Sequence, residues 1–317
     1  MRRGCGAAAF AAMCVLLAFV ASAQGSTTGQ NVQVSVLTAF PAGGGPAAAA
    51  ATSNGDVVAA AGTRLVGVNP NGKQNPFAVT ISGGAFGFPI GIAYGKSGQL
   101  YAALPGSFGP QPSGAPGVLK ISANGKSTTP VPGSEGMVAA DGFGLDSSTG
   151  NLYVTDIYGN GIWRITGDGT AHLWTSVATN PQLVLPDGVK VFQNAIYTSI
   201  ESGKILRIPI NPDGSAGTAQ VWAQVPGPAF FDDMVLDDRT GDVYVSRLDT
   251  NQLLQITPAG VITPIATNAD GLLGAANMAL IHVGQSTVIY LANGAVDFLG
   301  TGQTTFLPPS LLKITIS

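Results

Sequence analysis

Carboxylate or carboxamide side chains recur along this chain at nearly constant intervals, each near the start of a short segment of small and apolar residues. The positions are Asp141, Asp187, Asp232 with its neighbour Asp233, and Asn277, and the steps from 141 to 187, 232 and 277 are 46, 45 and 45 residues. Carboxylate and carboxamide oxygens suit hard cations such as Ca²⁺ and Mg²⁺. A cation held by them could polarise a carbonyl group and lower the pKa of a bound water.

Each aspartate also has a purely structural interpretation. An Asp before Gly at the start of a strand often accepts a hydrogen bond from the backbone two residues on, and in a repeat protein this turn could recur without any metal. Asp141 and Asp187 are both followed by Gly, so both interpretations stay open for them. The adjacent pair Asp232–Asp233 favours a functional role, since two carboxylates exceed what one turn needs.

The functional interpretation predicts a divalent-cation site, for Ca²⁺ or a similar ion, where these residues converge. Its predicted ligands are Asp141, Asp187, Asp232 and Asn277, and the predicted catalytic residues are Asp187 and Asp233. Like charges in close proximity raise at least one pKa unless a cation or hydrogen-bond donors lie among them. Such a site requires a fold that brings distant segments together.

A short strand-like element repeats six times and indicates what positions these residues. Its copies, apolar at the first, second and fourth positions, are LVGVN at 65, VLKIS at 118, IWRIT at 162, ILRIP at 205, LLQIT at 253 and LLKIT at 311. A turn such as PNG, GDG or PDG follows the first five copies, and Asn-Gly and Asp-Gly favour tight hairpins because both tolerate positive φ. With two strand-like segments upstream and one after the turn, each unit is predicted to be a meander of four antiparallel strands.

A four-stranded unit of about 45 to 50 residues has the size of a propeller blade. Counted from their innermost strands, the units start at Pro46, Pro89, Asp141, Asp187, Asp232 and Asn277. We predict an all-β fold, a six-bladed β-propeller with four-stranded blades; the alternative is an open β-sandwich or two stacked domains. In a propeller the starts of the innermost strands gather at one mouth of the central channel, where the acidic residues would converge.

The two ends of the chain are predicted to share the last blade. The sixth unit stops at SLLKITIS (310–317), after its third strand, and VQVSVLTAFP (32–41) resembles TAQVWAQVP (218–226), an outermost strand. Pairing the N-terminal strand with the last unit, a 3+1 closure, seals the ring and removes two exposed sheet edges. Residues 24–317 would then form a single propeller domain.

The first 23 residues are predicted to be a secretory signal peptide. A basic start, MRRG, precedes the apolar run AAAFAAMCVLLAFV, and ASA at 21–23 is typical of a cleavage site. Both cysteines lie in this leader, so the mature chain would have neither a disulfide nor a membrane span. We expect a secreted protein, periplasmic if the source is bacterial; a retained membrane anchor is the alternative.

Composition restricts the kind of partner. Charged residues make up 10% of the chain and its net charge is −3 without a basic run, which argues against binding nucleic acid or anionic lipid. His172 and His282 are the only histidines; His172 is predicted on an outermost strand and His282 away from the acidic mouth. A Ser-His-Asp triad is therefore not expected.

The segments ADGFGLDSSTGNLYVTDIYGNGIWRITGDG, LPDGVKVFQNAIYTSIESGKILRI and FDDMVLDDRTGDVYVSRLDTNQLLQITPAG resemble units of the gluconolactonase and senescence-marker-protein superfamily and its NHL-like relatives. The similarity covers most of 46–315 and is clearest in 140–266. It implies a six-bladed propeller and, for the enzymes, a channel-bound divalent metal and hydrolysis of lactones or related esters. Asp141 and Asp187 match the Asp-Gly pattern of the family's metal ligands, and Asn277 matches by position.

One ligand of those enzymes, a Glu that opens the first blade, has no counterpart here. GGGPAAAA stands at 43–50, and Glu occurs only at 135 and 201. Two functions therefore stay open at this stage. One is a secreted metal-dependent hydrolase of a small lactone or ester; the other is a secreted propeller that binds a small molecule in its channel, or a protein, without turnover.

Overall fold

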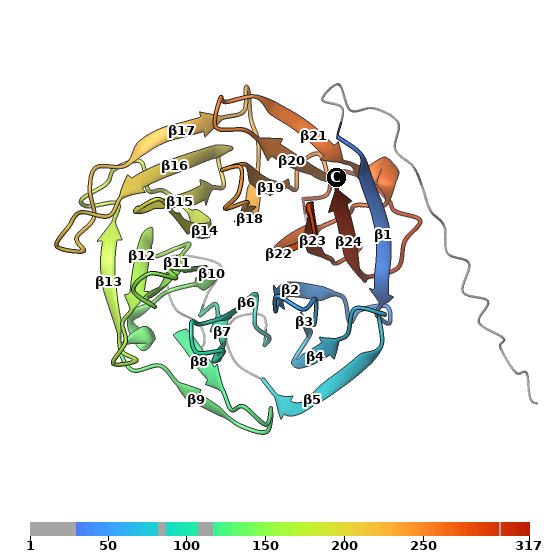
Figure 1. Ribbon diagram of the computed structural model, residues 1–317, viewed down its shortest axis with the longest axis horizontal. Helices are drawn as coiled ribbons and strands as arrows, with labels where there is room; N and C mark the ends of the chain where they lie inside the picture. Colours follow the sequence, from blue (N-terminus) through green and yellow to red (C-terminus); the bar gives the residue numbers. More distant parts are fainter. Residues whose placement is uncertain (1–29, 82–86, 107–116, 298) are drawn as a thin grey trace, which may run out of the picture.

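The chain forms six four-stranded antiparallel sheets arranged as a ring about a central axis (Figure 1). The computed structural model describes residues 30–81, 87–106, 117–297 and 299–317. The predicted all-β six-bladed propeller is confirmed. The predicted signal peptide, 1–23, lies outside these residues, so export stays a prediction. Within the described residues no helix is long and apolar enough to cross a membrane.

Each blade is a meander whose strands follow one another outward from the axis. The first three blades contain β2 (Pro46–Ala51), β3 (Val57–Ala61), β4 (Arg64–Val68) and β5 (Gln74–Thr80); β6 (Gly91–Tyr94), β7 (Leu100–Leu104), β8 (Gly117–Ile121) and β9 (Thr128–Pro130); and β10 (Ala140–Leu145), β11 (Leu152–Asp156), β12 (Gly161–Ile165) and β13 (Ala171–Ser176). The repeated pentapeptide forms the third strand in every blade. The inner strand of blade 2 begins at Gly91 rather than at Pro89.

The last three blades have the same order. They contain β14 (Pro186–Phe192), β15 (Ala195–Ile200), β16 (Lys204–Pro209) and β17 (Gln220–Gln224); β18 (Phe231–Leu236), β19 (Val243–Arg247), β20 (Gln252–Ile256) and β21 (Ile262–Ala266); and β22 (Ala275–Val283), β23 (Ser286–Asn293), β24 (Ser310–Ile316) and β1 (Val32–Ala39). Two 3₁₀ turns, Ser134–Gly136 and Asn268–Asp270, lie between blades.

The predicted 3+1 closure is confirmed by the register of the sixth blade. Strand β1 pairs antiparallel with β24 from Val32 opposite Ile316 to Ala39 opposite Ser310. Figure 1 shows β1 as the outermost strand beside β24, at the point where the ring closes. The closing strand thereby leaves no gap between the last blade and the first.

Apolar side chains of neighbouring sheets pack face to face between blades. Val34 of β1, for example, is buried in a cluster that includes Tyr244 of blade 5 and Leu312 of blade 6. This packing fixes the angle between blades and so the position of each inner strand.

We expect Val34→Asp to destabilise the protein by about 3 kcal/mol or more, because it buries an unpaired charge in the closing blade. For a domain of this size that corresponds to a fall in Tm of about 6–12 °C. Ser35→Asp is the matched control, since Ser35 is the next residue of β1 and its side chain is exposed. Equal melting temperatures for the two variants would contradict a stabilising role for the closure.

Candidate functional site

The predicted acidic residues lie in a backbone irregularity that four blades share. The inner strand breaks register with the second strand after Ala140, Pro186, Phe231 and Ala275 and resumes pairing at Phe143, Val189, Met234 and Met278. Bulges of this kind redirect side chains and are frequent next to active sites. The irregularity therefore gives the residues inside it a common orientation at one end of the inner strands.

Position within this bulge defines two rows of equivalent residues. The first row is Asp141, Asp187, Asp232 and Ala276, and the second is Gly142, Gly188, Asp233 and Asn277. The constant sequence interval made Asn277 the equivalent of Asp232, whereas in the structure it is the equivalent of Asp233. Three of the predicted ligands thus share one row, and Asn277 lies one residue further into the channel.

Buried hydroxyl groups on the second strands hold the first row in place. They are Thr155, Ser199 and Ser246, at equivalent positions of blades 3, 4 and 5. The Oγ of Ser199 accepts a hydrogen bond from Gly188 N and donates one to the carbonyl oxygen of Asp232, both at 2.7 Å. Thr155 donates in the same way to the carbonyl oxygen of Asp187. Thr155 and Ser199 thus each join one blade to the acidic residue of the next, which limits relative movement of the carboxylates. Ser246 joins blade 5 in the same way to Ala276 O of blade 6, at 3.2 Å.

The glycine of the Asp-Gly pair provides space between adjacent inner strands. A Cβ atom at Gly188 would lie 2.4 Å from Asp233 Oδ1 and 2.6 Å from Met234 N of the next blade. Within the described part of the chain, no hydrogen bond joins the carboxylate of Asp141 or Asp187 to the backbone two residues on. Close approach of the strands therefore explains this glycine, and the turn considered as the structural alternative is not formed.

Five carboxylates influence one another at this mouth of the channel. Burial, and then the neighbouring carboxylates, raise the pKa of Asp141 and Asp187 well above the usual value. Burial raises the pKa of Asp232 to about 7, with Asp233 and Glu201 adding to it, and burial alone raises the pKa of Glu201 to about 7. The pKa of Asp233 is also raised by burial. Glu201 follows β15 and was not among the predicted ligands.

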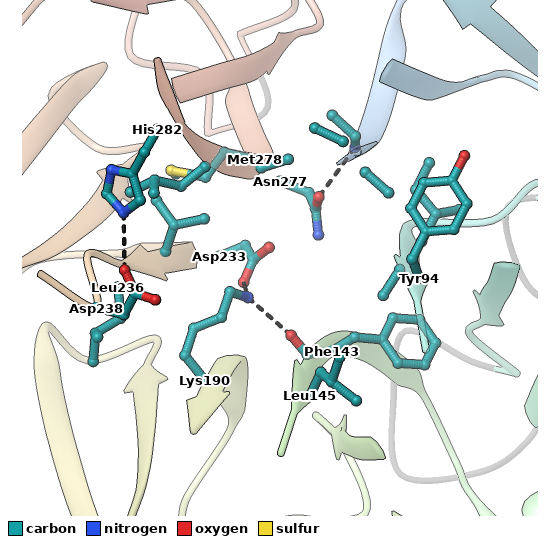
Figure 2. A pocket seen from close by; sticks show the side chains of 18 residues that line it. Tyr94, Phe143, Leu145, Lys190, Asp233, Leu236, Asp238, Asn277, Met278 and His282 are labelled. Carbon is teal, nitrogen blue, oxygen red and sulfur yellow. Dashed lines mark hydrogen bonds and ion pairs between the residues drawn. The ribbon is translucent and has the colours of Figure 1, made fainter. Parts of the chain in front are cut away.

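Lys190, in the channel wall, partly compensates the negative charge of these carboxylates. Its Nζ donates to Phe143 O at 2.9 Å and lies 3.4 Å from Asp233 Oδ1, so this blade 4 side chain contacts blades 3 and 5 (Figure 2). It lowers the pKa of Asp233 and Asp141, but less than burial raises them. One ammonium group therefore leaves most of the five carboxylates uncompensated.

Two carboxylate oxygens at this mouth are buried without a hydrogen-bond partner among the described residues, Asp187 Oδ1 and Asp233 Oδ2. Buried acceptors without donors are costly, and a cation is one of the groups that compensate them. The donor set is all oxygen, which fits a hard divalent cation such as Ca²⁺ or Mg²⁺. The residues present therefore fit the predicted kind of ion, although the first two blades contribute no carboxylate to it.

Asn277 has a hydrogen-bonding role that the sequence did not indicate. Its Oδ1 accepts a hydrogen bond from Ala49 N at 3.1 Å, which links the last blade to the first across the point of closure. In Figure 2 the amide nitrogen, rather than the oxygen, faces the cavity. As oriented here, Asn277 joins two inner strands, and its role as a ligand stays a prediction.

A second group of polar side chains lies at the opposite ends of the inner strands. The His282 Nε2 atom of β22 lies 2.9 Å from Asp238 Oδ1 and 3.6 Å from Asp237 Oδ1, which follow β18. His282 and Asp238 border a cavity of about 320 Å³ that extends inward to Lys190 and Asp233 (Figure 2). The predicted separation of His282 from the acidic mouth holds, but its two acidic neighbours were not foreseen.

The sequence signal for this second group was ambiguous. LDDRTGD at 236–242 parallels LDSSTGN at 145–151, where Asp146 accepts a hydrogen bond from Ser148 N at 2.9 Å. Asp237 forms the same turn, accepting from Arg239 N at 2.8 Å. The segment that contains Asp237 therefore indicated only a turn. The contact between Asp237 and His282 could not be predicted from that segment, because the two residues belong to different blades.

Comparison with solved structures places the chain among known propellers. A gluconolactonase from Xanthomonas campestris matches over 90% of both chains with a TM-score of 0.65 at 15% identity. A luciferin-regenerating enzyme matches over 86% of this chain and 92% of its own with a TM-score of 0.62 at 10% identity. Catalytically inactive virginiamycin B lyase from Staphylococcus aureus, with quinupristin, covers 93% of both chains with a TM-score of 0.56 at 15% identity.

These similarities define the class of protein as a six-bladed β-propeller. Its structural neighbours include gluconolactonases, so the resemblance to the gluconolactonase and senescence-marker-protein superfamily is confirmed at the level of the fold. No protein-family model and no curated protein matches the sequence itself.

Proposed function

We propose that this chain is an exported, divalent-cation-dependent hydrolase of small lactones or esters that acts at the acidic mouth of its channel. The observation that carries the proposal is the set of five converging carboxylates, two of which have buried oxygens without partners. Such a set is unfavourable by itself and favourable around a cation. Structural neighbours described as gluconolactonases support the substrate class.

The three aspartates of the first row, Asp141, Asp187 and Asp232, would hold the cation. Bound there, a divalent cation supplies Lewis-acid polarisation of a carbonyl oxygen and acidifies a water molecule. The hydroxyl groups of Thr155 and Ser199 keep the backbone of this row in position before substrate arrives. Because the row is fixed by the fold, little reorganisation is required on binding.

Two further carboxylates are positioned to accept a proton from the attacking water. Asp233 Oδ1 is held by Met234 N at 2.7 Å and approached by Lys190, which leaves Oδ2 as the available acceptor. The pKa of Glu201 is about 7, and a general base is most effective when its pKa lies near the working pH. Glu201 therefore brings to the mouth a carboxylate that the first blade does not supply.

The test is hydrolysis of a panel of small lactones and esters by the purified chain, with and without added Ca²⁺, Mg²⁺ or Mn²⁺. Asp187→Asn removes one ligand charge with little change in shape, so we expect kcat/KM to fall about 100-fold or more. Asp213→Asn is the matched control, because Asp213 lies in an exposed turn with its carboxylate bonded to Ser215. Its activity should equal that of the unmodified chain.

Cation binding without hydrolysis of any panel member would favour the alternative, a propeller that binds a ligand without turnover. The virginiamycin B lyase neighbour with quinupristin illustrates a propeller of this fold with a small ligand. Absence of cation binding, or unchanged binding in Asp187→Asn, would overturn the proposed site.

A further inference from the structure

We propose that Asp237, Asp238 and His282 form a second metal site, at the opposite end of the channel from the acidic mouth, and that it takes a transition-metal ion of the Zn²⁺ class. One ligand atom from each residue lies within 4.8 Å of the other two. The two aspartates follow the inner strand of blade 5 and the histidine lies on that of blade 6, so a bound ion would join two blades.

Two of the three distances among these ligand atoms are close to what a tetrahedral ion requires, and the third is within 4.8 Å. Ligands about 2.1 Å from Zn²⁺ in tetrahedral geometry are about 3.4 Å from one another. The distance from His282 Nε2 to Asp237 Oδ1, 3.6 Å, already fits. The 2.9 Å distance to Asp238 Oδ1 is a hydrogen bond that must lengthen slightly, and the side chain of Asp238 is 76% exposed and free of packing that would prevent this.

Outer hydrogen bonds fix the most buried ligand. Thr287 Oγ1 donates to Asp237 Oδ2 at 2.5 Å and Arg239 N donates to Asp237 Oδ1 at 2.8 Å. Asp237 is 1% exposed, so its carboxylate cannot turn away from His282. Metal ligands are typically oriented in this way by hydrogen-bonded neighbours.

An independent feature is the cavity that opens beside this group. His282 and Asp238 both line it, and its volume of about 320 Å³ leaves room for a fourth ligand of the ion (Figure 2). Most of its remaining wall is apolar, including Tyr94, Phe143 and Leu280. Three protein ligands with an open fourth position facing a cavity are typical of a zinc site that binds a small molecule.

The two ends of the channel should select different ions. Imidazole nitrogen favours Zn²⁺, Ni²⁺ and Cu²⁺, whereas the acidic mouth offers only oxygen, which favours Ca²⁺ and Mg²⁺. Lys190, bonded to Phe143 O and Asp233, lies at the inner end of the cavity and places a positive charge between the two sites. Binding at one end can therefore be measured separately from binding at the other.

The experiment is a calorimetric titration of the full chain with ZnCl₂ while the acidic mouth is saturated with CaCl₂. We expect one equivalent of Zn²⁺ to bind, and His282→Ala to weaken that binding about 100-fold or more. Asp187→Asn is the control at the other site and should leave Zn²⁺ affinity unchanged. No Zn²⁺ binding by the unmodified chain, or equal binding by His282→Ala, would overturn the proposal, whereas loss of Ca²⁺ binding alone would count only against the proposed function.

A second pair of variants tests whether weaker Zn²⁺ binding could result from general misfolding. Thr287→Val removes the hydrogen bond to Asp237 without removing a ligand, and we expect Zn²⁺ affinity to fall by about 10- to 100-fold. Thr287→Ser keeps the hydroxyl, so its Zn²⁺ affinity should equal that of the unmodified chain. Co²⁺ absorption adds a direct reading of the coordination sphere: a tetrahedral spectrum in the unmodified chain that is lost in His282→Ala supports the site. Equal affinities of the Val and Ser variants would contradict the assigned outer hydrogen bond.

Discussion

The cation-free protein is expected to lose stability as the pH rises from 5 to 8. In the folded state the pKa values of Asp232 and Glu201 are about 7, and those of Asp141 and Asp187 are well above the usual value, whereas in the unfolded chain such groups titrate near pH 4. Between those values the folded state binds more protons, so the free energy of unfolding falls as pH increases. This stabilising contribution is fully present below about pH 4 and is lost as pH rises through about 7.

Carboxylates elsewhere in the chain do not mask this loss of stability between pH 5 and pH 8. Burial would raise the pKa of Asp146, but hydrogen bonds from Ser148 and Thr149 outweigh it and lower the pKa. The pKa of Asp249 is lowered in the same way, because the hydrogen bond from Arg247 outweighs its burial. Their stabilising contribution is lost only as pH falls below about 4. Melting curves recorded in chelator at pH 5 and pH 8 therefore report mainly on the acidic mouth.

Added divalent cation should reverse the loss at pH 8. At a concentration about 100-fold above Kd, binding to the folded state alone stabilises it by about 2.7 kcal/mol, which raises Tm by about 5–11 °C. At pH 5 the protonated carboxyl groups compete with the ion, so we expect a much smaller increase.

Asp187→Asn gives this prediction a distinctive control. Replacing a buried carboxylate that lacks a partner for Oδ1 by a neutral amide should raise the Tm of the cation-free protein at pH 8, while abolishing the gain on adding cation. A higher Tm of the unmodified chain at pH 8 than at pH 5 in chelator would contradict this charge arrangement at the acidic mouth. So would a Tm of Asp187→Asn below that of the unmodified chain at pH 8 in chelator.

The fold could be predicted because its signals are local and repeated. Each pentapeptide strand and following turn, such as IWRIT before GDG, specifies a hairpin by itself, and six copies specify the number of blades. The closure was also predictable, because the missing outermost strand of the last unit has the pattern of 32–41. These features depend on the alternation of apolar residues and hardly on side-chain geometry.

The site could be predicted only in part because its details depend on register. Counting residues cannot reveal the bulge that makes Asn277 equivalent to Asp233, and a hydroxyl in YVTD or YTSI looks like any strand residue. Glu201 lies after the second strand of blade 4, and its electrostatic effect on Asp141 depends on how the adjacent blades 3 and 4 pack against each other. Contacts between blades are separated by about 45 residues, so no single segment contains them.

We expect Gly188→Ala to be among the most damaging single substitutions in the chain. The added Cβ would lie 2.6 Å from Met234 N and 2.9 Å from Asp233 Cα, both backbone atoms that cannot move away alone. Overpacking of this kind costs about 3 kcal/mol, equivalent to about 6–12 °C in Tm. Cation affinity should fall as well, because separating these inner strands moves Asp232 of blade 5 away from Asp187 of blade 4 in the first row.

Gly167→Ala is the matched control, since Gly167 is exposed and a Cβ there meets no atom within 4 Å. Its stability should change by no more than about 0.5 kcal/mol. Much of the strain at Gly188 arises from Asp233 Oδ1, 2.4 Å from the new atom, so Asp233→Ala should relieve part of it. The free energy of unfolding lost by the double variant should therefore be smaller than the sum of the two single losses by about 1 kcal/mol or more. Urea unfolding measures all three losses. Strictly additive losses would show that the Asp233 carboxylate is not the group for which Gly188 makes room.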